Sequence, residues 1–464
     1  MGALVRNRNA PPRPHALTST LTVRRYRPTR DRGSARIPRA GGRGIFSLLV
    51  AVAAAALTWF SPAGAYFSGD PAPVGGRIPL VRVGVAPEVS EVRLSARSAW
   101  YLGIVGSAST PTRIGAGVTW VLRPGERGVR VLDESGRLRG ERSDTLFAYP
   151  ADPETGYLQI NGKAYRGECV AWAAGGKVTA VNVLDLESYL RAVLPPEMGP
   201  QPPVRDQALQ AQAIAARSYT LSMMGRWAAR GFDLLATVED QVYGGVEAER
   251  PACTLAVEET RGEVGVHDGA PIRAFYSSTC GGHTAAPDEV WSRPPAPYLQ
   301  AVRDMTSRVD HSFCSISPLF HWEESWTAAK LEEILRKSLP RVRPDWNAKR
   351  AGRLAGVSLR ERSISRRASC LRLQFQRGHV DLSGDEIRWV LRRPNGEGLR
   401  SALLQRVQVS RSKGRLARVK IEGQGYGHGV GMCQYGAMGM AEAGYDHKQI
   451  IRFYYRGAQV RRFY

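Results

Sequence analysis

The segment Leu190–Leu221, LRAVLPPEMGPQPPVRDQALQAQAIAARSYTL, constrains the fold more than any other part of the chain. Its first half is rich in proline and glycine. Pro195 and Pro196 predict a turn there, because proline lacks the N–H group that continues a helix. Good helix formers follow Asp206, which predicts that a helix begins at about this residue. Glu197 therefore stands in a predicted turn just ahead of a helix.

The predicted helix carries small residues along one face. Four residues recur at spacings of four, three and four, and therefore share that face: Leu209, Ala213, Ala216 and Thr220. Because these side chains are mostly small, another element can approach the helix closely. A carboxylic acid on a rigid turn beside a tightly packed helix is a suitable arrangement for a proton donor.

A second conspicuous run, Gly423–Ala437, reads GQGYGHGVGMCQYGA, and two shorter segments lie between it and the helix: DQVYGG at 240–245 and YSSTCGGHT at 276–284. Together these segments resemble the signatures of the SpoIID/LytB family, roughly P-x-E-M followed by A-L-x-A-Q-A-x-A-A-R-[ST]-Y. The resemblance covers roughly residues 165–460. Two long motifs in the same order are far more specific than a single glycine pattern.

The resemblance implies a peptidoglycan lytic transglycosylase, with Glu197 at the position of the family's catalytic glutamate. Such an enzyme cleaves the bond between N-acetylmuramic acid and N-acetylglucosamine and leaves a 1,6-anhydro end. A free glutamate titrates near ~4.3, so burial beside Pro195, Pro196 and Met198 must raise the pKa of Glu197 if it is to donate a proton. An exposed glutamate that caps the following helix is the alternative interpretation.

Seven further residues in the matched motifs are predicted to bind substrate: Arg217, Ser218, Tyr219, Gln241, His428, Gln434 and Tyr435. Arg217 has three interpretations: it orients Glu197, binds substrate, or forms a salt bridge in the core. The glycines around His428 permit positive φ and a close approach to a sugar, but a tight turn with a buried His428 fits the sequence equally well. Glu239 and Asp240 are the nearest second acids, and no direct catalytic role is expected for them.

The six cysteines include no C-x-x-C pair. We predict a disulfide between Cys280 and Cys314, as suits an exported protein, and no metal or other cofactor. The alternative is a zinc site that adds His283 and His311 to these two cysteines. Cys433 stands where the family usually has serine, which leaves its role open between a metal ligand, a free thiol and a small packing residue.

The N-terminus predicts export. Residues 1–44 are rich in Arg, Pro and Gly and are not expected to fold. An apolar run follows at 45–60, shorter than the roughly 20 residues of a membrane-spanning helix, and Ala63-Gly64-Ala65 supplies a cleavage site for a signal peptide. The long n-region indicates either a start codon further downstream or an uncleaved anchor at 45–60. The expected location is periplasmic or cell-wall associated.

The formal net charge of +23 is shared between the N-terminal segment, which carries about ten of these charges, and the rest of the chain. No nucleic-acid motif accompanies the charge, so nucleic acid is not a predicted partner. Peptidoglycan glycan strands, a cell-wall amidase and an anionic membrane surface are the predicted partners. A solvated arginine-rich surface without a partner explains the charge equally well.

Short apolar runs separated by turn residues predict strands from residue 78 onward. Helices are predicted at 326–339, with Thr327 as N-cap, and at 446–455. The expected fold is α+β: a β-rich catalytic core with a few helices, preceded by a small β module. The predicted boundaries are 1–65 for the targeting segment, 66–77 for a linker, 78–160 for the β module and 161–464 for the catalytic domain.

The predicted function is therefore glycan cleavage by a lytic transglycosylase. The rival from another class is a non-catalytic wall-binding protein that enhances an N-acetylmuramoyl-L-alanine amidase, because LytB-type relatives are named for that effect. A hydrolase with two carboxylates is a third interpretation, and it differs from the first in leaving reducing ends.

Overall fold

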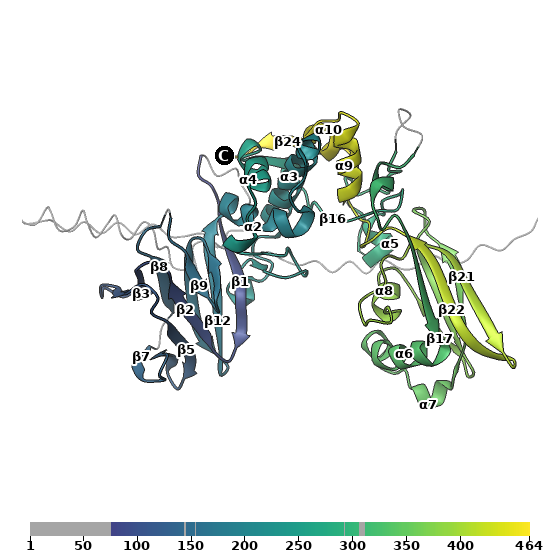
Figure 1. The fold of residues 1–464 in the computed structure, drawn as a ribbon, viewed down its shortest axis with the longest axis horizontal. Helices are drawn as coiled ribbons and strands as arrows, with labels where there is room; N and C mark the ends of the chain where they lie inside the picture. Colours follow the sequence, from purple (N-terminus) through teal and green to yellow (C-terminus); the bar gives the residue numbers. More distant parts are fainter. Residues whose placement is uncertain (1–75, 143–144, 154, 292, 306–310) are drawn as a thin grey trace, which may run out of the picture. The chain divides into compact units, whose positions relative to one another are not determined.

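The computed structural model describes residues 76–142, 145–153, 155–291, 293–305 and 311–464, all within one unit of the chain (Figure 1). The predicted targeting segment 1–65 and most of the linker lie outside these residues. Strands alone form the first part of the described chain, and helices are mixed with further strands after it, which confirms the α+β prediction. No helix of the described part is both long and apolar enough to cross a membrane.

Two sheets, antiparallel except for one short parallel pair, form the first part of the described chain (Figure 1). The larger sheet has the order β13-β1-β12-β11-β8-β3-β4. Its strands are β1 (Leu80–Val89), β3 (Trp100–Ile104), β4 (Thr112–Ile114), β8 (Leu146–Pro150), β11 (Glu168–Ala174), β12 (Lys177–Asp185) and β13 (Leu234–Leu235), the last pairing parallel with β1. The smaller sheet, in the order β10-β9-β2-β5-β6-β7, contains β2 (Val92–Ala96), β5 (Trp120–Gly125), β6 (Gly128–Asp133), β7 (Leu138–Arg142), β9 (Leu158–Ile160) and β10 (Lys163–Tyr165).

Strand pairing crosses residue 160, where the sequence places a domain boundary. Strand β12 pairs with β1 in the register Val83↔Asn182, and β11 pairs with β8 in the register Cys169↔Ala148. The apolar side chains of both sheets also join one buried cluster with the helices that follow. The β module and the start of the catalytic domain therefore share sheets and a core, because neither sheet closes its apolar face alone.

Helix α2 (Leu186–Met198) corrects the prediction of a turn around Glu197, which lies in the last turn of this helix. Pro196 leaves the Ala192 carbonyl without its helical donor, and the N–H of Gly244 donates to that carbonyl at 3.0 Å instead. Gly199, with a φ of 67°, then ends the helix.

Helix α3 (Asp206–Met223) begins where the sequence predicts it, with Asp206 in its first turn. Residues 208–221 are all buried, so burial is not limited to the predicted face of small residues but extends around the whole helix. Four elements pack around α3 together with α2: α4 (Pro251–Glu259), β14 (Glu263–His267), α9 (Gln434–Glu442) and α10 (His447–Tyr454). A helix buried on every side must find partners for each polar side chain it carries.

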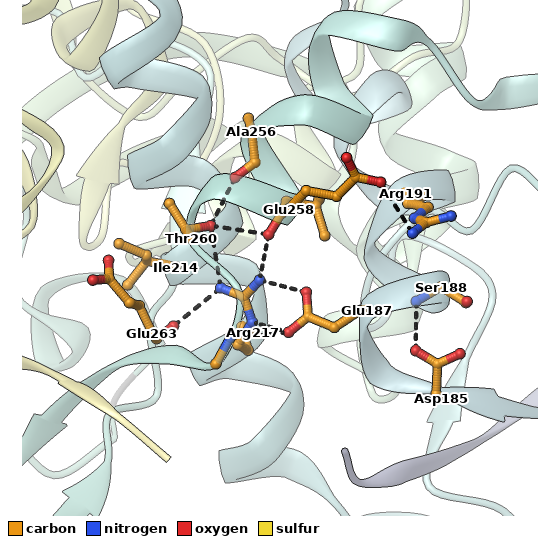
Figure 2. A network of polar contacts seen from close by, with 12 residues as sticks. Asp185, Glu187, Ser188, Arg191, Ile214, Arg217, Ala256, Glu258, Thr260 and Glu263 are labelled. Carbon is orange, nitrogen blue, oxygen red and sulfur yellow. Dashed lines mark hydrogen bonds and ion pairs between the residues drawn. The ribbon is translucent and has the colours of Figure 1, made fainter. Parts of the chain in front are cut away.

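Arg217 on α3 is fully buried and forms a two-pronged ion pair with Glu187 on α2 (Figure 2). Its Nε and Nη2 donate to the two Glu187 carboxylate oxygens at 2.9 and 2.7 Å. Nη1 donates to the Glu263 carbonyl at 3.0 Å, and the Tyr464 hydroxyl donates to Glu187 at 2.6 Å. Of the three interpretations of Arg217, the structure supports the core salt bridge, which joins α2, α3, β14 and the C-terminus.

A second buried cluster lies within residues 322–421 and was not predicted from the sequence. It packs two three-stranded sheets with helices: β17 (His321–Thr327), β21 (Leu404–Ser412), β22 (Arg415–Gln424), β18 (Leu354–Arg362), β19 (Ala368–Phe375), β20 (His379–Leu382), α6 (Ala328–Val342), α7 (Ala348–Ala351) and α8 (Glu386–Val390). The predicted cap is confirmed, since the Thr327 side chain accepts from the Lys330 N–H at 3.2 Å.

Shorter elements connect these two cores. Strand β14 forms a hairpin with β15 (Ala270–Pro271) and also pairs with β24 (Gln459–Arg462). Strand β16 (Tyr276–Ser277) pairs parallel with β23 (Met432–Cys433), and α5 (Pro287–Trp291) follows. The predicted final helix is α10, which Asp446 caps.

We expect Arg217→Met to lower the free energy of unfolding by about 3–5 kcal/mol, because it leaves the Glu187 carboxylate buried without its cation. Urea unfolding at neutral pH measures this change. Arg191→Met is the matched control, since Arg191 on α2 pairs with the exposed Glu258, and it should cost no more than about 1 kcal/mol. Equal losses for the two variants would contradict the role given to Arg217.

Candidate active site

A cavity of about 340 Å³ opens beside the C-terminal end of α2. Its lining is formed by Glu197 from α2, by side chains of α3 and of the loop at 238–242, and by residues in or beside β16, α5 and the glycine-rich loop. The lining residues are Glu197, Tyr219, Met223, Arg226, Val238, Glu239, Asp240, Val242, Phe275, Tyr276, Trp291, Arg293 and His428. The two long sequence motifs therefore meet in one cavity, although more than 200 residues separate them along the chain.

Glu197 is the acid of this cavity. Burial raises the pKa of its carboxyl group to about 7. Hydrogen bonds from the Val242 N–H and the Gln434 side chain lower the pKa, but their effect is smaller than that of burial. The Val242 N–H lies 3.4 Å from Oε1. Glu197 does not cap α3, whose N-cap is Arg205. A glutamate with this pKa is close to half protonated at neutral pH, as a general acid requires.

Gln241, predicted to bind substrate, is buried below the cavity instead of lining it. Its Oε1 accepts from the Thr220 hydroxyl at 2.8 Å and from the Tyr189 hydroxyl at 3.3 Å, and its Nε2 donates to the Tyr276 hydroxyl at 2.9 Å. These bonds tie α2, α3 and β16 to the loop that carries Val242. Gln241 therefore holds the backbone that faces Glu197.

Of the three consecutive α3 residues predicted at the site, only Tyr219 lines the cavity. Arg217 is occupied by Glu187. The Ser218 hydroxyl is buried, donates to the Ile214 carbonyl at 2.6 Å and accepts from the Gly265 N–H at 2.8 Å. Successive helical residues point about 100° apart, so one face of α3 reaches the cavity and the other faces build the core.

The two second acids differ in their surroundings. Asp240 accepts from Trp227 Nε1 at 2.8 Å, from the Leu235 N–H at 2.9 Å and from the Tyr219 hydroxyl at 3.4 Å, and it pairs with Arg226. Its oxygens are thus occupied by donors from the protein. Glu239 is exposed at the rim of the cavity.

His428 reaches the cavity from the glycine-rich loop. Its Nδ1 accepts from the Val430 N–H at 3.0 Å, and its ring packs against Trp291 with centroids 4.9 Å apart. Burial lowers the pKa of His428 to about 4, with Arg388 adding to the effect. The imidazole is therefore neutral at neutral pH and carries its hydrogen on Nε2, so it is a hydrogen-bond donor at the site and not a cation.

Gln434 and Tyr435, at the start of α9, lie outside the cavity lining. The Gln434 side chain is buried, hydrogen-bonds Glu197 and donates to Gln212 Oε1 at 3.4 Å. Tyr435 packs on the core and its N–H donates to the Ser278 carbonyl at 3.0 Å. Gln434 thus contacts the acid directly, whereas Tyr435 supports the backbone behind it.

Sequence reasoning missed several residues of the cavity wall: Arg226, Val242, Phe275, Trp291 and Arg293. Phe275 directly precedes the YSSTCGGHT motif, and Val242 lies inside DQVYGG, so proximity to a motif was an available signal for these two. No motif marks Trp291 or Arg293, which the fold brings to the cavity through α5.

The predicted disulfide is not formed in the structure. Cys280 and Cys314 are thiols whose sulfur atoms lie 3.6 Å apart, whereas a disulfide bond is about 2.05 Å long. The alternative zinc set is also not assembled as predicted, because the buried group of metal-binding side chains around Cys280 and Cys314 includes neither His283 nor His311. Instead, Cys433 and Asp304 join the two cysteines in one buried cluster.

Comparisons with known proteins agree with the motifs. The family model described as Stage II sporulation protein (SpoIID) matches residues 174–267, and a model described as a domain of unknown function matches residues 310–431. The first covers β12, α2 and α3, and the second covers the whole of the second buried cluster.

Three relatives extend this similarity. An uncharacterised protein of Brachyspira hyodysenteriae is 30% identical over 302 residues, which are 65% of this chain and 73% of that protein. The amidase enhancer of Bacillus subtilis is 30% identical over 309 residues, 58% of this chain and 40% of that protein. Stage II sporulation protein D of Bacillus subtilis is 25% identical over 298 residues, 61% of this chain and 76% of that protein.

The matched regions contain the α2–α3 segment that positions Glu197. The motif order, the family match and the named relatives agree on the same class of protein. The chain belongs to the SpoIID family, and its function is of the cell-wall-related SpoIID type.

Proposed function

We propose that this protein is a peptidoglycan lytic transglycosylase that cleaves the glycosidic bond between N-acetylmuramic acid and N-acetylglucosamine, with Glu197 as its acid and base. One observation carries the proposal: Glu197 faces a cavity, and its pKa is raised to about 7 by burial. Perturbed carboxyl groups in cavities are characteristic of catalytic sites. A non-catalytic wall-binding protein does not need a carboxyl group that stays partly protonated at neutral pH.

In the proposed reaction Glu197 donates its proton to the glycosidic oxygen, and the bond from that oxygen to muramic acid C1 breaks. The C6 hydroxyl of the same muramic acid then attacks C1 and forms the 1,6-anhydro ring. The Glu197 carboxylate takes the C6 hydroxyl proton, which restores the starting protonation state. No water is consumed, and one carboxyl group serves both steps.

The second acids support this mechanism over hydrolysis. A hydrolase needs a second carboxylate as base or nucleophile. Asp240 lines the cavity, but its oxygens are occupied by Arg226, Trp227, Leu235 and Tyr219. Glu239 is exposed at the rim. Glu197 is thus the carboxyl group at this cavity whose surroundings favour a protonated form.

The cavity wall suits a sugar with a carboxylate substituent. Phe275, Tyr276 and Trp291 offer aromatic faces on which the C–H faces of sugar rings pack. Arg293 is exposed and lies over the Trp291 ring, with its guanidinium 5.6 Å from the ring centroid. A guanidinium there would pair with the lactyl carboxylate of muramic acid, which is free only in strands stripped of stem peptides. We therefore propose such strands as the preferred substrate.

Export through the segment at 45–65 is part of the proposal, because the substrate lies outside the cytoplasm. A second candidate function is a wall-binding enhancer of a cell-wall amidase. The relative named amidase enhancer, at 30% identity, favours it, as does the formal net charge of +23. The half-buried Glu197 at the cavity, with its pKa raised to about 7, favours the enzyme.

Incubating the purified chain with peptide-free glycan strands should release fragments with 1,6-anhydro ends, detected by mass spectrometry. Glu197→Gln should lower this rate at least about a hundredfold, the usual contribution of general acid–base catalysis, because an amide keeps the acceptor for the Val242 N–H but holds no acidic proton. Glu126→Gln, on the turn between β5 and β6, controls for the loss of a charge.

Glu239→Gln separates the two glycan-cleaving mechanisms. The transglycosylase retains anhydro products in this variant, whereas a hydrolase that used Glu239 would lose its reducing-end products. If the wild-type chain releases no fragments but accelerates an added amidase, the enhancer function replaces the proposed one.

The pH dependence follows from the raised pKa of Glu197, about 7. The free enzyme must hold the proton, so kcat/KM should be level at pH values below about 7 and fall about tenfold per pH unit above it. Initial rates on a soluble glycan between pH 5 and 9 measure this profile. A rate that rises as pH increases through 7 would contradict proton donation by Glu197.

A further inference from the structure

Four buried side chains with metal-binding atoms meet outside the cavity: Cys280, Asp304, Cys314 and Cys433. Each residue is inaccessible to solvent. Each residue offers one ligand atom, a sulfur or a carboxylate oxygen, and these four atoms all lie within 4.8 Å of one another. They come from four separate places in the chain, namely the loop after β16, a loop before the turn at 313–316, that turn itself, and the end of β23.

The spacing fits a tetrahedral ion. Zinc binds sulfur at about 2.3 Å, which places two sulfur ligands of a tetrahedron about 3.8 Å apart. The Cys280 and Cys314 sulfur atoms are 3.6 Å apart. Three sulfurs and one oxygen would complete four-coordination without water, as in closed structural zinc sites.

Hydrogen bonds hold the four groups in this arrangement. The N–H groups of Cys280 and Gly436 donate to Cys433 Sγ at 3.1 and 3.3 Å. The Cys314 N–H donates to Asp304 Oδ2 at 2.8 Å, and the Tyr454 hydroxyl donates to Asp304 Oδ1 at 2.5 Å. Outer contacts of this kind orient metal ligands and favour their ionised forms.

The charges around the cluster also favour a cation. Asp304 forms no ion pair among the described residues, and a buried carboxylate is costly without a positive partner. The buried Arg367 guanidinium is nearby, but it donates to the backbone carbonyls of Cys280 and His283, at 3.0 and 2.9 Å. A divalent ion would neutralise two of the four negative charges of the ionised ligands, and the Arg367 guanidinium would offset part of the rest.

We propose that Cys280, Asp304, Cys314 and Cys433 bind a structural zinc ion. Thiolate ligands select a soft or borderline metal such as zinc over magnesium or calcium. The set differs from the one suggested by the sequence, since Asp304 and Cys433 take the places of His283 and His311. It also gives a role to Cys433, which the sequence motif left open.

The ion would stabilise the elements that form the wall of the candidate active site. Cys433 pairs with Ser277 across the β16–β23 ladder, in the same register that pairs Met432 with the cavity residue Tyr276. Cys433 also caps α9 and directly precedes Gln434, which hydrogen-bonds Glu197. The site does not depend on the proposed reaction, because an enhancer with this fold would contain it as well.

The full chain, purified without added metal or chelator, should contain about one zinc ion per molecule by mass spectrometry of metals. Replacement with cobalt should give visible bands of tetrahedral cobalt and a thiolate charge-transfer band in the near ultraviolet. Cys433→Ser and Asp304→Asn should each lower zinc content and the thermal midpoint. Cys253→Ser and Cys370→Ser, which alter cysteines outside the cluster, should retain full zinc content.

Thiol labelling of the wild-type chain keeps the proposal testable if the cluster variants do not fold. Cys280, Cys314 and Cys433 should resist alkylation in the purified protein and become reactive together after a strong chelator is added. A chain free of zinc whose peptides show a Cys280–Cys314 disulfide would overturn the proposal. Equal loss of zinc in Cys253→Ser would also overturn it, because the metal would then bind elsewhere or nonspecifically.

Discussion

The burial of helix α3 on every side is the constraint on which the rest of the structure depends. A buried charge without a partner is costly in this position, and Arg217 is satisfied by the Glu187 carboxylate and the backbone of β14. The same ion pair fixes α2 against α3, and the last turn of α2 carries Glu197. Placement of the acid is therefore a consequence of how the core satisfies one buried guanidinium.

The rigid packing of α2 against α3 holds the Glu197 carboxyl group in surroundings that disfavour its charged form. Glu197 faces aromatic and apolar residues and receives only a long hydrogen bond from the Val242 N–H and a contact from Gln434. Asp240, which lines the same cavity, has donors on both oxygens. The two carboxyl groups in this cavity thus differ in their contacts: Asp240 is held by hydrogen-bond donors, whereas burial raises the pKa of Glu197 to about 7.

The sequence predicted the site better than the architecture around it. The motifs located Glu197, Tyr219 and His428, which share the cavity. The prediction of a turn at Pro195 was wrong. Local sequence rules could not detect that the Gly244 N–H donates to the Ala192 carbonyl of this helix, because the two residues lie far apart in the sequence. The sheets shared across residue 160 and the core at 322–421 were also not predicted, because they depend on pairing between strands that lie far apart in the sequence. The cysteine cluster escaped prediction for the same reason, since Asp304 belongs to no motif.

The central claim is that Glu197 holds a proton near neutral pH, and direct titration tests it most simply. Carbon-13 labelling of glutamate side chains, with Glu197→Gln to assign the signal, allows the carboxyl resonance to be followed by NMR between pH 3 and 9. The account predicts a midpoint of about 7 for Glu197. A midpoint near ~4.3, the ordinary value for glutamate, would contradict it.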